Sequence, residues 1–224
     1  MTAFPMLAAV GRSKIRLVAA TTSSTNQVLI SAKAREGDLA VLFDASFNVE
    51  SRPNTALPTG WGSHINDSYK QEVAGKTISG GRAIISSKIL TAGDAGATVT
   101  GMDTNATVRK TLLVFRARKP IIARSAVDPK GYIGLADPDQ RDLTFGANAP
   151  PAIVLAFAAT ANTGNGDVAF TVQTPPFEEL VANTGNQITG YTIFQDGDAV
   201  PDQSFDMDDL SRNAMFGLYL QIAT

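Results

Sequence analysis

Short apolar runs with a period of two residues dominate this chain and most restrict the fold that it can adopt. Segments such as "KIRLVAA", "QVLISAK", "RAIISSKIL" and "DVAFTVQT" are rich in Val, Ile and Phe and are bounded by Gly, Pro, Asn, Asp and Thr. Such runs are typical of β-strands. Many short strands separated by turn residues predict an all-β fold, an antiparallel β-sandwich of jelly-roll-like type. The only helical turn that we expect lies at 176–182, "PFEELVA", where Pro176 takes a permitted first position.

Two of the runs are apolar at consecutive positions instead of alternating. They are "LLVF" at 112–115 and "AIVLAF" at 152–157. A continuous run predicts a strand that is covered on both faces. Neighbouring subunits could supply this cover, and so could long loops of the same chain.

Charge and cysteine content exclude several classes of partner and site. The net charge is −2 with a pI of about 5.4, and Lys and Arg are scattered along the 224 residues. Binding to a phosphate backbone needs clustered positive charge, so we expect no nucleic-acid partner. The chain has no cysteine, which excludes disulfide bonds and thiolate metal ligands.

The N-terminal segment "MTAFPMLAAVGRSK" has no basic residue before its short apolar run, so we expect neither a secretory signal nor a membrane span. Its strand pattern is poor. We expect residues 1–13 to form an arm that docks on a neighbouring chain, and residues 14–224 to form the β-sandwich domain.

Four aromatic or Met landmarks recur in the same order in the two parts of the chain. The predicted pseudo-repeat halves span about 37–117 and 150–224. The matched pairs are Phe43 with Phe157, Trp61 with Phe177, Met102 with Met207, and Phe115 with Tyr219.

Trp61 is the single tryptophan of the chain and follows a Pro-Thr-Gly turn. A ring that recurs as Phe177 in the other half favours a packing role in a core or an interface, while a sugar-stacking surface is the alternative. Tyr69 and Tyr132 are the other candidates for contact with a glycan or a neighbouring protein.

The order of "GDLAVLFDAS", "PTGW", "LTAGDAGATV" and "LLVFR" resembles structural proteins of tailed bacteriophages and phage-like particles. The likeness covers about residues 37–117 well and 150–224 more loosely. It implies a virion component, a head decoration, spike-base or tail-associated protein, that folds in the bacterial host cytoplasm before assembly. The implied partners are capsid, spike, fibre or tail subunits and further copies of the chain. The alternative is a receptor-binding module that recognises a host-surface carbohydrate.

Candidate catalytic groups are few, so we expect no enzyme, no cofactor and no metal. His64 is the only histidine, and no Gly-x-Ser-x-Gly or phosphate-binding glycine motif is present. The acidic segment at 196–209, "DGDAVPDQSFDMDD", is dense enough for Ca²⁺ but lacks the spacing of a calcium loop. Asp206 and Asp208 fit a solvated strand edge, which is the interpretation that we favour.

Overall fold

The computed structural model describes residues 15–47, 57–73, 76–101, 107–125, 140–143, 152–161, 170–174, 179–183, 187–193, 203–207 and 212–222. All regular structure in these residues is β-strand, and every strand pair is antiparallel, which confirms the all-β prediction. The expected arm at 1–13 and Tyr132 lie outside the described residues.

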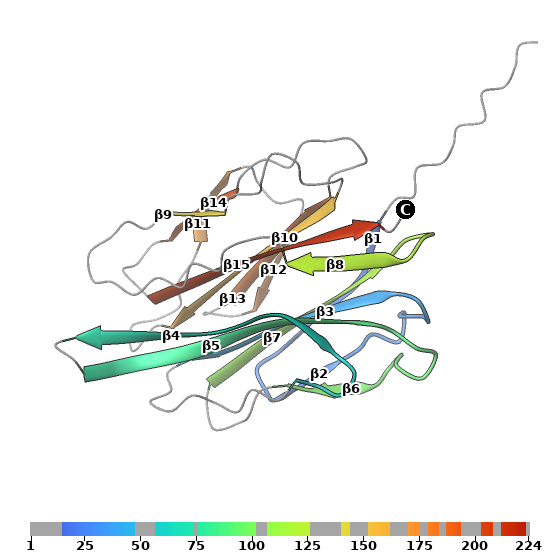
Figure 1. Ribbon diagram of the computed structural model, residues 1–224, viewed down its shortest axis with the longest axis horizontal. Coiled ribbons are helices and arrows are strands. Elements are labelled where there is room, and N and C mark those ends of the chain that lie inside the picture. Colours follow the sequence, from blue (N-terminus) through green and yellow to red (C-terminus); the bar gives the residue numbers. More distant parts are fainter. Residues whose placement is uncertain are drawn as a thin grey trace, which may run out of the picture.

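Two five-stranded sheets lie face to face (Figure 1). The first sheet has the order β1 (Arg16–Ser23), β7 (Thr107–Arg116), β3 (Leu39–Phe47), β5 (Lys76–Ile89) and β4 (Gly62–Val73). The second has the order β12 (Glu179–Asn183), β13 (Gln187–Ile193), β10 (Ala152–Ala161), β15 (Arg212–Ile222) and β8 (Ile121–Ser125).

Two smaller sheets complete the described structure. The β2–β6 ribbon pairs β2 (Gln27–Leu29) with β6 (Thr98–Thr100). A three-stranded sheet has the order β11 (Phe170–Thr174), β14 (Gln203–Met207) and β9 (Gln140–Leu143).

The two large sheets share one strand order. The strands correspond in pairs: β8 to β1, β15 to β7, β10 to β3, β13 to β5 and β12 to β4. Strands that are neighbours in one sheet correspond to strands that are neighbours in the other. The pairing of β2 with β6 likewise matches the pairing of β9 with β14, and only β11 has no counterpart. Each large sheet comes from one continuous part of the chain, 16–116 or 121–222. The duplication expected from the sequence stays a prediction, and this strand order favours it.

Contacts between the large sheets follow the same symmetry. The matched strands β3 and β10 contact each other, and so do β4 with β15 and its counterpart β12 with β7. The outer strands repeat the pattern, with β1 against β12 and β8 against β4. Exchange of the two halves maps these contacts onto one another, whereas the contact of β10 with β5 has no equally extensive counterpart between β3 and β13 among the described residues.

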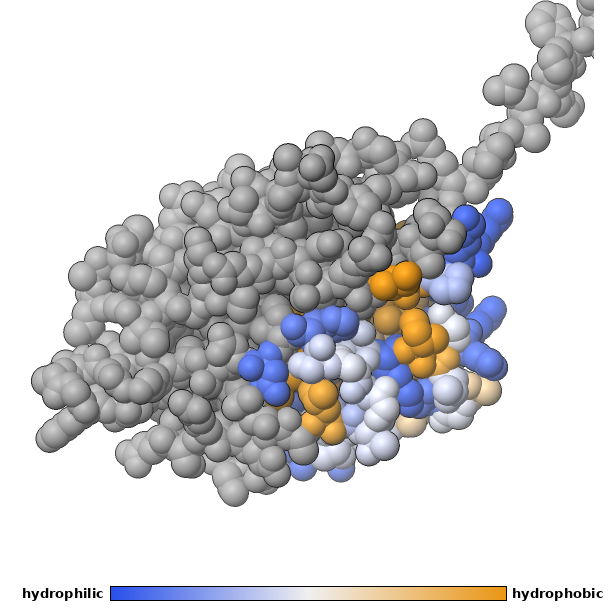
Figure 2. Space-filling model, in the orientation of Figure 1, coloured by the Kyte–Doolittle hydropathy of each residue, from blue (hydrophilic) through white to orange (hydrophobic). Residues whose placement is uncertain are grey.

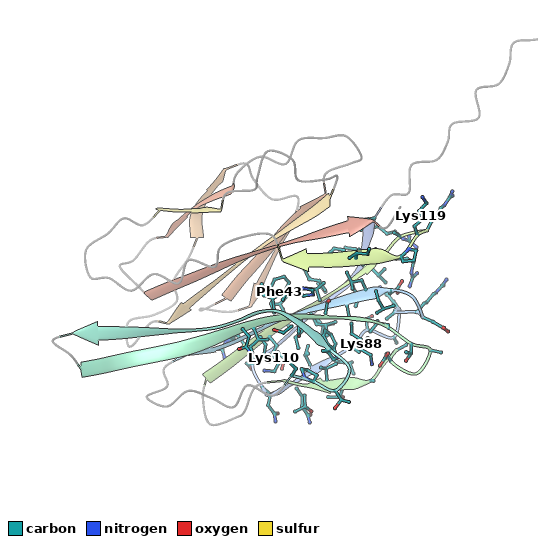
Figure 3. All side chains as sticks on the ribbon, viewed as in Figure 1. Phe43, Lys88, Lys110 and Lys119 are labelled. Atoms are coloured by element: carbon teal, nitrogen blue, oxygen red, sulfur yellow. The ribbon has the colours of Figure 1, made fainter. Side chains whose placement is uncertain are left out.

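Burial of the first sheet on both faces explains the continuous apolar run at 112–115. Residues 112–115 are all fully buried. Leu112 and Val114 pack into a cluster with the ribbon residues Val28 and Val99. Phe43, on the opposite face of β3, lies between the two large sheets (Figure 3). For the run at 112–115 the cover comes from this chain itself, so that run requires no neighbouring subunit. The side chains of the run at 152–157 lie outside the described residues.

Two local expectations are wrong. The segment at 179–183 is not helical but forms β12, which pairs with β13 along its whole length. Its short apolar sequence is ambiguous, and strand pairing decided its conformation. Asp206 does not lie on a sheet edge, because β14 is flanked by both β11 and β9. The rest of the acidic segment, outside 203–207, lies beyond the described residues.

A buried ion pair joins β3 to β7. Lys110 Nζ donates to Asp44 Oδ1 at 2.6 Å, and the two side chains are 0% and 3% exposed. Gly101 lies against the pair, since a methyl group there would overlap the Asp44 carboxylate and come within 2.7 Å of Lys110 Cε. If Phe43 is matched to Phe157, then Asp44 corresponds to Ala158, and its register partner Lys110 corresponds to Met215, the register partner of Ala158. The second half thus places an apolar pair where the first half has charges.

We expect Asp44→Ala or Lys110→Met alone to lower the free energy of unfolding by about 3–5 kcal/mol, because each removes one partner of a buried ion pair. The double substitution reproduces the Ala158 and Met215 pair and should recover most of this loss. Urea unfolding of the three variants measures the effect. A double variant as unstable as the sum of the single ones would contradict the interpretation.

Candidate functional site

Trp61 is placed by the turn that precedes it. The Trp61 backbone N–H donates to the Pro58 carbonyl at 3.1 Å, and Gly60 at the third position has a φ of 82°. This is the backbone of a type II turn, which favours glycine at that position. The turn leads the Trp61 side chain into the cluster on the ribbon side of the first sheet, where it is 8% exposed. Its burial agrees with the packing role expected from the sequence.

The structure does not bring the aromatic candidates together. Tyr69 lies on β4 opposite Gly81, eight residues after Trp61, or roughly 26 Å along an extended strand. Tyr132 is outside the described residues. Contact of these three residues with a glycan or a partner stays a prediction.

A pocket of about 420 Å³ lies beside Trp61. Its walls are the turn at 57–61, strand β6 with its flanking residues, and the side chains of Lys88 and Asp94. Thr59, Thr98 and Thr100 are exposed, so the pocket opens to solvent. This combination of a buried aromatic wall and a few polar groups is typical of ligand sites.

Lys88 and Asp94 form the charged part of this pocket. Lys88 Nζ donates to Asp94 Oδ1 at 2.7 Å, with the side chains 22% and 15% exposed. Asp94 Oδ2 accepts from the Thr91 backbone N–H at 2.7 Å and from its hydroxyl at 2.8 Å. The hydrogen bond from Lys88, followed by that from the Thr91 backbone, lowers the pKa of Asp94 to about 2. The Asp94 carboxylate is therefore charged at neutral pH.

The turn at 91–97 is itself held in place by the backbone. Gly96, with a φ of 75°, donates to the Ile30 carbonyl at 3.0 Å, and Ile30 donates to the Ala97 carbonyl at 2.9 Å. The sequence indicates this Gly-rich turn but not the partner of Asp94, because Lys88 belongs to the preceding strand. Lys88 and Asp94 are the site residues that sequence reasoning missed.

A second ion pair joins the start of β3 to the end of β7. Arg116 donates to both carboxylate oxygens of Asp38, each at 2.6 Å, and to the Lys33 carbonyl at 3.0 Å. The hydrogen bond to Asp38 raises the pKa of Arg116. Asp38 Oδ2 also accepts from the Arg35 backbone N–H at 2.8 Å. Asp38 of the "GD" motif and Arg116 of the "FR" motif thus form an ion pair that joins the two strands.

His64 lies on strand β4. It falls at a register shift between Ser63 and Ile65, and its Nε2 is 2.7 Å from Ser87 Oγ. Burial lowers its pKa, so the imidazole is neutral at pH 7. Within the described residues no carboxylate contacts its Nδ1, and the pair lacks the third group of a hydrolase triad. That the protein is not an enzyme stays a prediction.

Other sites and relatives give no further assignment. The described part of the chain holds no group of three or more His, Cys, Asp or Glu side chains arranged for a metal ion, and no helix able to cross a membrane. Comparisons with protein-family models, curated proteins and solved structures give no match to this chain.

We expect Trp61→Ala to lower the free energy of unfolding by about 3–5 kcal/mol, since it removes a large core side chain, and Trp61→Phe to have a smaller effect. If the halves are related by duplication, Phe177→Ala should cause a similar loss. Denaturant unfolding tests all three. An unchanged midpoint for Trp61→Ala would exclude the packing role.

The single histidine makes a pH test specific. The folded state binds the His64 proton less readily than the unfolded state, so the full stability is present above the unfolded pKa of about 6.5. It should fall as the pH decreases from about 6.5 through the lower folded pKa. We expect the urea midpoint to decrease from about pH 7 to about pH 5 in the parent and much less in His64→Gln. Equal pH dependence in the two proteins would assign the effect to other groups.

Proposed function

We propose that this protein is a structural component of a phage or phage-like particle that acts through protein–protein contacts, on a jelly-roll-like fold. The observation that carries the proposal is the pair of edge strands of each large sheet, each of which has a strand partner on one side within the described residues. Such an edge can pair with a strand of a neighbouring subunit. The resemblance of the sequence to virion structural proteins supports the setting.

The edge strands of the two large sheets, as the described residues define them, are the places where neighbours could attach. β1 and β4 end the first sheet, and β12 and β8 end the second, so each has one side without a strand partner in its sheet. β4 has twelve residues, and such an edge can accept a further strand through its backbone groups. Its two register shifts and the charged residues Asp67, Lys70 and Glu72 would limit indiscriminate pairing.

The apolar surface of the described part is less suited to docking. The large exposed aliphatic side chains Leu29, Ile89 and Ile122 belong to three different strands. Figure 2 shows that hydrophobic residues on this face gather in separate patches among polar ones. The edges therefore support the assembly role better than one continuous apolar patch does.

A second candidate function is recognition of a host-surface carbohydrate, which the pocket beside Trp61 favours. The two functions are compatible in one particle. The pocket supplies the chemistry for this role and the strand edges supply the attachment.

Particles purified from the organism that carries the gene provide the direct test. We expect the chain to sediment with the particles and to keep a constant copy ratio to the main coat protein, measured by quantitative mass spectrometry across a density gradient. A host cytosolic protein of similar mass is the control. Recovery of the chain only in the particle-free fractions would overturn the proposed function.

A further inference from the structure

We propose that the pocket beside Trp61 binds one uncharged mono- or disaccharide. This inference deepens the second candidate function and rests on it, and it does not depend on the assembly role. The pocket volume of about 420 Å³ lies at the small end of the range for small-molecule sites, which run from about 300 to 1,000 Å³. A short sugar fits this volume, whereas an extended chain would have to leave through the open side.

The apolar wall is preorganised. Trp61 lines the pocket, is 8% exposed and packs in the core cluster. Pro58 and Val99 extend the same apolar wall. A ring held in this way contacts a ligand without losing further conformational freedom, and it suits the C–H face of a sugar.

The charged wall presents a donor and an acceptor side by side. Lys88 Nζ and Asp94 Oδ1 are 2.7 Å apart, and both side chains remain partly exposed. Neighbouring hydroxyls of a sugar can donate to the carboxylate and accept from the ammonium group, and such charge-assisted hydrogen bonds are the stronger kind. The exposed Thr98 and Thr100 hydroxyls add two neutral groups on β6.

Charge balance argues for a neutral ligand. Lys88 and Asp94 are the charged residues among the described ones that line the pocket, and they compensate each other. An anionic ligand would meet the Asp94 carboxylate, and a cationic ligand would meet the Lys88 ammonium group. A polyhydroxylated neutral molecule avoids both penalties.

The described residues of the second half hold no counterpart of Lys88. Lys88 is the register partner of Ala40, and the matched strands place Thr192 opposite Val154 at that position. The polar pair is therefore specific to the first half, and we expect one site per chain.

Trp61 provides an internal probe, because it is the only tryptophan in the chain. Its emission should change and saturate when the full-length protein is titrated with one or more of the methyl glycosides of glucose, galactose, N-acetylglucosamine and rhamnose. Inorganic phosphate should cause no change. Calorimetry should give one site per chain. The absence of a saturable response to all four glycosides, or a response to phosphate instead, would overturn the proposal.

Substitutions locate the binding. Lys88→Met and Thr100→Val should each weaken binding of the responding glycoside by about tenfold or more, since each removes a hydrogen-bonding group from the pocket wall. Lys119→Met is the matched control, because Lys119 is exposed and lies well away from Lys88 in Figure 3. Thr100→Val keeps the ion pair, so it decides the question if Lys88→Met fails to fold. Unchanged affinity in the folded pocket variants would overturn the proposal. Thr100→Val should be incorporated into particles as the parent is. A failure of incorporation would implicate this position in assembly and not in sugar binding.

Discussion

Both faces of the central strands β3 and β7 must be shielded from water, and the packing of the first half depends on this requirement. One face is covered by the β2–β6 ribbon and Trp61, and the other by the second large sheet. Polar groups on these strands therefore need partners inside the protein, which Asp44 and Lys110 supply to each other. On the neighbouring strand β5, the buried hydroxyl of Ser86 has no hydrogen-bond partner within the described structure.

The two halves share a strand order but differ in the residues at corresponding positions. At matched register positions the first half has Asp44 and Lys110, and the second has Ala158 and Met215. Ser86 likewise falls on Gly190, the partner of Ala156. Buried charges are not needed for this topology, because an apolar pair can occupy the same place. The buried charges are thus specific to the first half, and so is the Lys88 side of the pocket.

Local sequence predicted some of the site and not the rest. The Pro58–Trp61 turn follows from glycine at its third position, which alone tolerates the positive φ without strain. The pairing of Lys88 with Asp94 depends on how β5 ends and how the turn at 91–97 folds back on Ile30. The helical turn expected at 176–182 was wrong, because pairing with β13 outweighed a weak local preference.

The sequence by itself determined that the chain is all-β and that a buried aromatic ring follows the Pro-Thr-Gly turn, because alternation, turn residues and apolar content act over a few residues. Only the tertiary structure decided which strands became neighbours. It also decided that the run at 112–115 is covered by this same chain, and that the Lys88–Asp94 pair lies beside Trp61. The strand neighbours, the cover of this run and the position of the pair beside Trp61 depend on contacts between residues far apart in the sequence, and a short segment carries no information about which distant partner will bury it.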